Sequence, residues 1–214
     1  MGRSIPILAL CLAACGGREP LDPGSSEIDV IEGVANVDGY VVLQAVLRDA
    51  EGRPLAGLPV QWDTSGSENS ITSLRLYTDP SGLATALMHT DKPEVKRIAV
   101  RADNTSVFRE LEFAAGRPAW NTTLVIGNPA PADGASAVQV ELHVRDQFGN
   151  AVPHSPVQLL IQGTGATLEV QSADPARADA LGVFKAAVRS LVAQKVRVAA
   201  RTGTFTVIRD AEFF

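Results

Sequence analysis

The sequence predicts an all-β protein built from two tandem β-sandwich domains, and three observations lead to this fold class. Apolar and polar residues alternate with a period of two, turn-forming residues recur at short spacing, and a module of about 90 residues occurs twice. Helical periodicity is nearly absent. The stretch 175–194 contains helix formers, but it aligns with a strand–turn–strand region of the first copy, so we expect strands there.

The internal repeat defines the domain organisation. The segment VVLQAVLRDAEGRPLAGLPVQW aligns without a gap with VQVELHVRDQFGNAVPHSPVQL, and the shared residues include an Arg-Asp pair, a glycine and a Pro-Val-Gln run. Two shorter segments continue the alignment after loops that differ in length by three residues. The matched ranges are 41–62 with 138–159, 78–86 with 178–186, and 108–113 with 208–213.

Within each copy the pattern predicts about seven strands, which is typical of a β-sandwich. In 138–145 the apolar residues occupy every second position, as a half-buried strand requires. The matching strand of the first copy also carries Val42 and Val46 on its outer face, and these are either covered by a loop or form an apolar contact face. The predicted strands are 27–32, 41–48, 58–63, 71–77, 83–89, 96–102, 107–113, 123–128, 138–145, 157–162, 167–172, 183–189, 194–201 and 205–213.

Four aspartates stand at the start of predicted turns, each followed three residues later by a glycine. An aspartate can accept hydrogen bonds from its own turn, and glycine tolerates a positive φ. We therefore interpret these acids as turn caps rather than as calcium ligands, because none has the dense acidic spacing of a calcium loop. They are Asp49, Asp79, Asp146 and Asp179.

The segments RDQFGNAVPHSPVQL (145–159) and YTDPSGLATA (77–86) resemble the bacterial immunoglobulin-like domains of the invasin and intimin group. Each copy departs from the family pattern once, with Arg53 in place of an asparagine and Ala178 in place of a threonine. The resemblance covers nearly all of 28–214 and implies two Ig-like sandwiches that act as spacers or binding scaffolds on cell surfaces. Trp62 aligns with Leu159 at an inward position of its strand, so we expect it in the core of its domain.

The amino terminus has the layout of a secretory signal, with one basic residue, a short apolar stretch and small residues before Cys15. The run LAAC at 12–15 resembles the bacterial lipobox, in which the cysteine is acylated after cleavage just before it. Cys15 is thus the predicted lipidation site, and Cys11 would leave with the signal. The predicted domains are a signal at 1–14, a lipidated cysteine and flexible tether at 15–27, Ig-like domain 1 at 28–115, a linker at 116–122 and Ig-like domain 2 at 123–214.

Composition excludes several classes of function. The net charge of -5 and the scattered basic residues argue against nucleic-acid binding. The histidines His89, His143 and His154 are far apart in the sequence, so we interpret them as solvated and expect no metal site and no cofactor. No catalytic motif occurs, and we expect no catalytic residue and no enzymatic activity.

Trp120 lies between the two copies. Its side chain would either pack between the domains and hold them against each other or pack under the second sandwich.

The predicted function is adhesion or surface protein interaction by a lipid-anchored envelope protein. If the cell is Gram-negative, the expected place is the outer membrane. Its partners would be the membrane, through the lipid on Cys15, and a protein or surface glycan. Two alternatives stay open. One is a structural or accessory subunit of an envelope assembly, and the other is a carbohydrate-active enzyme.

Overall fold

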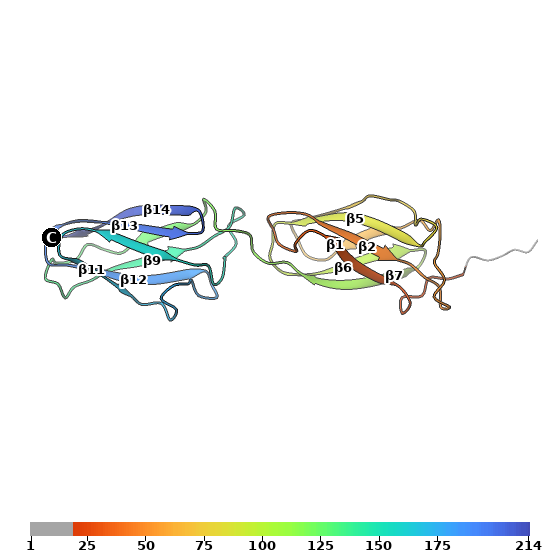
Figure 1. The fold of residues 1–214 in the computed structure, drawn as a ribbon, viewed down its shortest axis with the longest axis horizontal. Coiled ribbons are helices and arrows are strands. Elements are labelled where there is room, and N and C mark those ends of the chain that lie inside the picture. Colours follow the sequence, from red (N-terminus) through yellow and green to blue (C-terminus); the bar gives the residue numbers. More distant parts are fainter. Residues whose placement is uncertain (1–18) are drawn as a thin grey trace, which may run out of the picture.

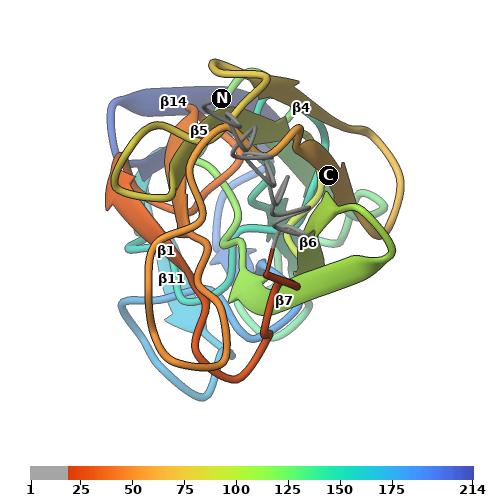
Figure 2. The same cartoon turned by 90° about the vertical axis from the view of Figure 1, so that its right-hand side faces the viewer.

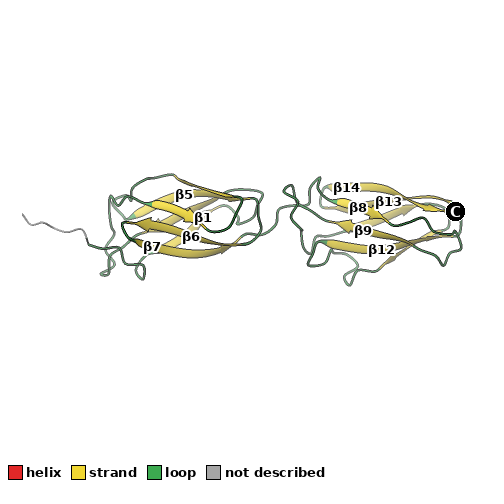
Figure 3. Ribbon diagram, turned by 180° about the vertical axis from the view of Figure 1, so that it is seen from behind, coloured by secondary structure: helices red, strands yellow, loops and turns green. Residues whose placement is uncertain are grey.

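The structure, a computed structural model, describes residues 19–214 and consists of two β-sandwiches that lie end to end (Figure 1). Across this part of the chain every regular element is a strand, with seven strands in each sandwich (Figure 3). The all-β prediction is therefore confirmed. Domain 1 contains β1 (Glu27–Glu32), β2 (Val41–Val46), β3 (Gln61–Thr64), β4 (Asn69–Ser73), β5 (Leu83–Thr90), β6 (Val95–Ala102) and β7 (Thr105–Glu112).

Domain 2 repeats these strands in the same order and with similar lengths. The stretch 175–194, which contains helix formers, forms a loop, the strand Val183–Ser190 and the turn that leads into the next strand, so tertiary pairing overrides local propensity there, as the repeat predicted. The strands are β8 (Thr123–Ile126), β9 (Val138–His143), β10 (Gln158–Gln162), β11 (Ala166–Val170), β12 (Val183–Ser190), β13 (Gln194–Thr202) and β14 (Phe205–Phe213).

Each domain packs a four-stranded sheet against a three-stranded sheet. In domain 1 the strand orders are β1-β2-β5-β4 and β3-β6-β7, and in domain 2 the corresponding orders are β8-β9-β12-β11 and β10-β13-β14, all antiparallel. Along the long axis, β4 and β5 lie in one layer of domain 1 while β6 and β7 lie in the other (Figure 2). The two layers bury the alternating apolar residues between them.

The core of each sandwich follows the period of two in the sequence. In β2, Val41, Leu43 and Ala45 are fully buried, while the residues between them are half-buried. Strand β9 shows the same alternation. Trp62 is buried in the core of domain 1, as expected, and its indole Nε1 has no hydrogen-bond partner among the described residues.

Two segments differ from the sequence-based expectation. The predicted strand 71–77 is shorter, because β4 ends at Ser73 and the chain then bends across to the other sheet, where Tyr77 pairs with Pro59. Leu21 lies within the predicted flexible tether, yet its side chain is buried in the core of domain 1. The backbone N–H of Asp22 also donates to Arg48 O at 2.9 Å. Residues 21 and 22 are therefore packed on domain 1.

Candidate functional site

The predicted lipidation residue, Cys15, lies outside the described residues, as does Cys11. Lipidation of Cys15 stays a prediction. Among residues 19–214 there is no helix long and apolar enough to cross a membrane.

The four turn acids cap their turns by one repeated geometry. In each turn one Oδ1 accepts the backbone N–H groups of the residues two and four positions later, at 2.8 to 3.1 Å. At Asp79 the Ser81 hydroxyl, followed by the Leu83 N–H, holds the pKa of the carboxyl below its usual value. The acids that the sequence marked as caps are thus used to build the loops at the ends of the sandwiches.

The three histidines occupy three different surroundings. His143 lies on the polar face of β9 with its Nε2 3.4 Å from Glu141 Oε2, and His154 stands in a turn with a φ of 55°. His89 was expected to be solvated, but its side chain is only 23% exposed and lies where the two domains meet. Within 19–214 there is no group of three His, Cys, Asp or Glu side chains that could hold a metal ion.

The junction between the domains is built around the turn of domain 2 that follows β9, at residues 146–150. The Asn150 amide nitrogen Nδ2 donates to Asp91 O of domain 1 at 2.8 Å and also to the Asp146 carboxylate of its own turn. Asp146 is fully buried, and its Oδ2 accepts the backbone N–H of Gly116 in the linker at 3.1 Å. One turn thus holds the linker and the neighbouring domain together.

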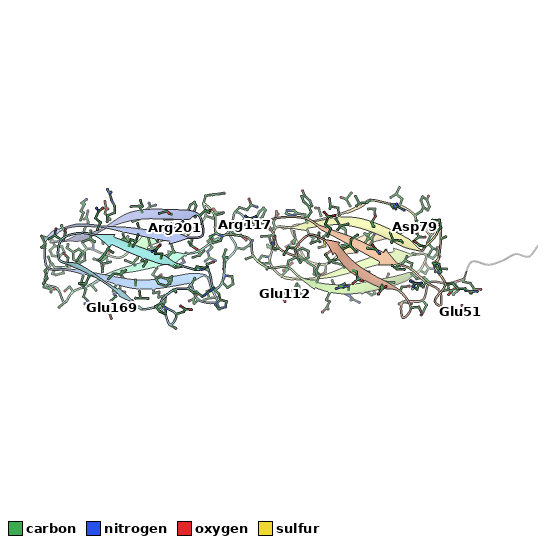
Figure 4. The ribbon with its side chains drawn as sticks, viewed as in Figure 1. Glu51, Asp79, Glu112, Arg117, Glu169 and Arg201 are labelled. Carbon is green, nitrogen blue, oxygen red and sulfur yellow. The ribbon has the colours of Figure 1, made fainter. Side chains whose placement is uncertain are left out.

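The linker adds a second set of contacts at the junction. The backbone N–H of Arg117 donates to Asp38 Oδ2 of domain 1 at 2.7 Å, and the Thr122 hydroxyl donates to Arg145 O of domain 2 at 3.0 Å. A side chain at position 116 would overlap the Asp38 carboxylate, so Asp38 would have to shift away from its hydrogen bond with the Arg117 N–H. Figure 4 shows Glu112 and Arg117 near this junction, whereas Glu51 and Asp79 lie at the remote end of domain 1.

Neither expectation for Trp120 is correct. The side chain is 71% exposed, so it neither packs under the second sandwich nor is buried between the domains.

Val42 and Val46 are half-buried on the outer face of β2, opposite Glu32 and Glu27 of β1. They are only partly covered, and they are not among the strongly exposed apolar residues.

A candidate contact surface that the sequence reading missed lies on the bent segment after β4. Leu74, Leu76 and Tyr77 are 54%, 67% and 60% exposed, and we refer to them as the apolar strip. Three large apolar side chains within four residues are unusual on the surface of a soluble domain and mark a candidate interaction site. The sequence carries the signal as LRLY at 74–77, but the same residues also fit the regular strand predicted over 71–77.

Domain 2 has no such strip at the equivalent place. Val60 N donates to Leu76 O in domain 1, and Val157 N donates to Ala176 O in domain 2, which makes Leu76 and Ala176 equivalent. By the matching bridges to Pro59 and Pro156, Tyr77 corresponds to Arg177. The apolar strip is therefore a property of domain 1 and not of the repeated module.

Comparison with known proteins agrees with the two-domain organisation. The family model for the bacterial Ig-like domain (group 1) matches residues 24–113 and again residues 121–213. A curated relative, the inverse autotransporter adhesin YeeJ of Escherichia coli strain K12, is 32% identical over 128 residues. That alignment covers 58% of this chain but only 5% of the relative's length.

Solved structures of adhesins share the fold. Invasin, described as a bacterial integrin-binding protein, superposes with a TM-score of 0.69 at 17% identity, covering 92% of this chain and 41% of that one. The Escherichia coli adhesin FdeC gives a TM-score of 0.64 at 16% identity, covering 90% of this chain and 66% of that one. InvD of Yersinia pseudotuberculosis gives 0.60 at 17% identity, covering 90% and 58%. With two matches of its model along most of the sequence, the chain belongs to the bacterial Ig-like domain (group 1) family.

Proposed function

We propose that this chain is a lipid-anchored protein of the cell envelope that uses its two Ig-like domains for adhesion or surface protein interaction. The observation that carries the proposal is the pair of group 1 bacterial Ig-like domains, docked end to end through Asn150, Asp146 and the linker. A module fixed to its neighbour by buried hydrogen bonds holds a contact surface at a set distance from an anchor.

The chemistry of the apolar strip favours a protein partner. Leu74 and Leu76 offer aliphatic surface, and Tyr77 offers an aromatic ring with a hydroxyl. Aromatic and aliphatic anchors of this kind are enriched at the centres of protein interfaces. The adhesins among the relatives support a role in surface contact, and they support a protein without enzymatic activity.

The test of partner contact is a photo-crosslinking amino acid placed at Leu76 in intact cells. The matched control carries it at Leu160, which is 57% exposed on β10 of domain 2. We expect a defined crosslinked product at position 76 that disappears in a Tyr77→Ser background. Equal products from both positions would contradict a specific role of the strip.

The test of anchoring is metabolic fatty-acid labelling of the wild type, of Cys15→Ser and of Cys11→Ser. We expect label in the wild type and in Cys11→Ser but not in Cys15→Ser. Label that persists in Cys15→Ser would reject lipidation at this residue.

A second candidate function is that of a structural or accessory subunit of an envelope assembly. It is favoured by the place of the apolar strip, which precedes Asp79 at the end of domain 1 that is remote from domain 2 (Figure 4). With an anchor at Cys15 this end would lie close to the membrane, where a neighbouring envelope protein is within reach. Protease added to intact cells separates the two functions, because an adhesin is cleaved and a shielded subunit is not.

A further inference from the structure

A cluster at the end of domain 1 surrounds His89 with acceptors and aromatic rings. Its Nδ1 lies 2.9 Å from Gly39 O, and its Nε2 lies 2.9 Å from Asp91 Oδ1. The Tyr40 ring centroid is 4.9 Å from the imidazole centroid, and the Phe148 ring, which belongs to domain 2, is 6.1 Å away. We refer to Gly39, Tyr40, His89 and Asp91 as the His89 cluster.

The two hydrogen-bond partners of His89 have a consequence for its charge. A backbone carbonyl and a carboxylate are both acceptors, so both ring nitrogens must donate to satisfy them. A neutral imidazole has only one N–H, whereas the imidazolium has two. In either neutral tautomer one nitrogen lone pair would face an oxygen lone pair of Gly39 or Asp91.

The same cluster carries the contacts that hold domain 2. The backbone oxygen of Asp91 accepts Asn150 Nδ2 of domain 2, while its carboxylate faces His89. Phe148 of domain 2 belongs to the same turn as Asn150 and approaches the imidazole from the other side of the junction. The position of Asp91 therefore couples the charge of His89 to the docking of this turn of domain 2.

Other charged groups stand on the elements around His89. The loop before β2 carries Asp38, which is engaged by Arg117 of the linker. On the side of β4, Ser70 pairs with His89, and Glu68 before it forms an ion pair with Lys92. On domain 2, Asp146 is engaged by Gly116 and Asn150. Asp91 is therefore the carboxylate in direct contact with the imidazole among the described residues.

The cluster is absent from the equivalent end of domain 2. Strand alignment places Ala137, Arg189 and Leu191 where domain 1 has Tyr40, His89 and Asp91. The His89 cluster is therefore not part of the sandwich module itself, and it occurs where a second domain is docked.

We infer that protonation of His89 stabilises the docked arrangement of the two domains. Protonated His89 donates to both Gly39 and Asp91, fixes Asp91 O for Asn150, and keeps the two domains in one orientation. When the proton is lost, one of these hydrogen bonds is lost and the junction loosens. Histidine side chains change charge between about pH 5 and 8, so the closed junction is favoured at the acidic end of this range and weakened as the pH rises.

The experiment measures the distance distribution between spin labels in the full chain. Labels are attached at Leu76→Cys and Leu160→Cys, both exposed, with Cys11 and Cys15 replaced by serine. We expect a narrow distribution at about pH 5 and a broader one at about pH 8, with the ratio of closed to open junctions falling about three- to tenfold. The ¹⁵N shifts of the His89 ring, recorded in parallel, should show loss of the proton over the same pH range.

Two variants and a control decide the outcome. His89→Gln, checked for folding by circular dichroism, should give a broad distribution at both pH values, and Asp91→Asn should reduce the pH dependence. His143→Gln, on the polar face of domain 2, should behave like the wild type. A pH-dependent narrowing that survives in His89→Gln would overturn the inference. So would ring shifts that show His89 titrating while the distance distribution stays unchanged.

Discussion

The two domains share one fold but differ at one fully buried position of their cores. Lys96 on β6 pairs with Leu111, and Val196 on β13 pairs with Ala211, so Lys96 and Val196 occupy the same place in the two sandwiches. Both side chains are fully buried. Domain 1 thus buries a lysine where domain 2 buries a valine.

The surroundings explain how domain 1 accepts the lysine. Lys96 Nζ donates to Ser67 O and to Glu94 Oε1, and this hydrogen bond holds the pKa of Glu94 below its usual value. In domain 2 the residue equivalent to Glu94 is Gln194, which bonds the backbone of Thr164 instead. A buried charge is tolerated where a partner of opposite charge is within reach, and a buried valine needs no partner.

The two domains therefore share one backbone arrangement, but the buried groups and their hydrogen-bond partners differ between them. Gly66 in domain 1 and Gly163 in domain 2 both leave room for the side chain at this position, since a Cβ on either would overlap the lysine or the valine. The same space is therefore filled by a charged lysine in domain 1 and by an apolar valine in domain 2.

The largest effect is expected from Val196→Lys, which moves the lysine into domain 2. Because Gln194 offers no negative charge, the ammonium would be buried without an ionic partner, and we expect domain 2 to lose about 4 kcal/mol or more. Domain-resolved hydrogen exchange in denaturant measures this loss. The control Val196→Ala should cost roughly 2 kcal/mol through the cavity it leaves. A lysine variant as stable as the alanine variant would show that the site can hydrate the ammonium.

A smaller effect is expected from Asn150→Ala at the junction. The variant loses the bonds of the amide to Asp91 O and to the Asp146 carboxylate, and domain 2 should be destabilised by about 1 to 2 kcal/mol. The equivalent residue of domain 1 is Arg53, whose Nε donates to Asp49 Oδ2 at 2.7 Å. Arg53→Ala is the matched control, since it alters the same turn without touching the junction. Domain-resolved hydrogen exchange measures the stability of domain 2, and spin-label distances between the domains report on the junction. We expect broader interdomain distances in Asn150→Ala than in Arg53→Ala, and equal broadening in both variants would contradict the special role of Asn150.

Lys96→Met should change the stability of domain 1 by no more than about 1 kcal/mol in either direction. Methionine fills a similar volume, and the Glu94 carboxylate, whose side chain is 42% exposed, stays in contact with water when the ammonium is removed. Denaturant unfolding followed by the fluorescence of the buried Trp62 reports on this domain. A loss of several kcal/mol would mean that the ion pair itself stabilises the sandwich.

The smallest effect is expected from Ser81→Leu, which gives the turn at Asp79 the residue found at position 181 of domain 2. Without the Ser81 hydroxyl the pKa of Asp79 should rise toward its usual value. A lowered pKa gives stability that is present above the unfolded-state pKa and is lost as the pH falls through the folded-state pKa. The variant should therefore lose this contribution at a higher pH than the wild type, as a titration of the Asp79 carboxyl by NMR would show. An unchanged titration would assign the shift to the backbone N–H groups alone.

Most of the fold could be predicted because its signals are local. The alternation in 138–145, the turn formers around Asp79 and the repeat itself each specify strands and turns by short-range rules. The bend after Ser73 and the packing of Leu21 could not be predicted, since both depend on which distant strand the chain meets. The exposed Trp120 was misread for the same reason.

The sequence by itself determined the fold class, the two copies, the turn caps and the prediction of Cys15 as a lipidation site, because each rests on a pattern of adjacent residues. Only the tertiary structure brought His89, Asp91 and Asn150 together and left Leu74, Leu76 and Tyr77 exposed. The physical reason is that these contacts join residues far apart in the sequence, such as Asn150 and Asp91, which are 59 positions apart, and no short-range periodicity encodes which distant residues meet.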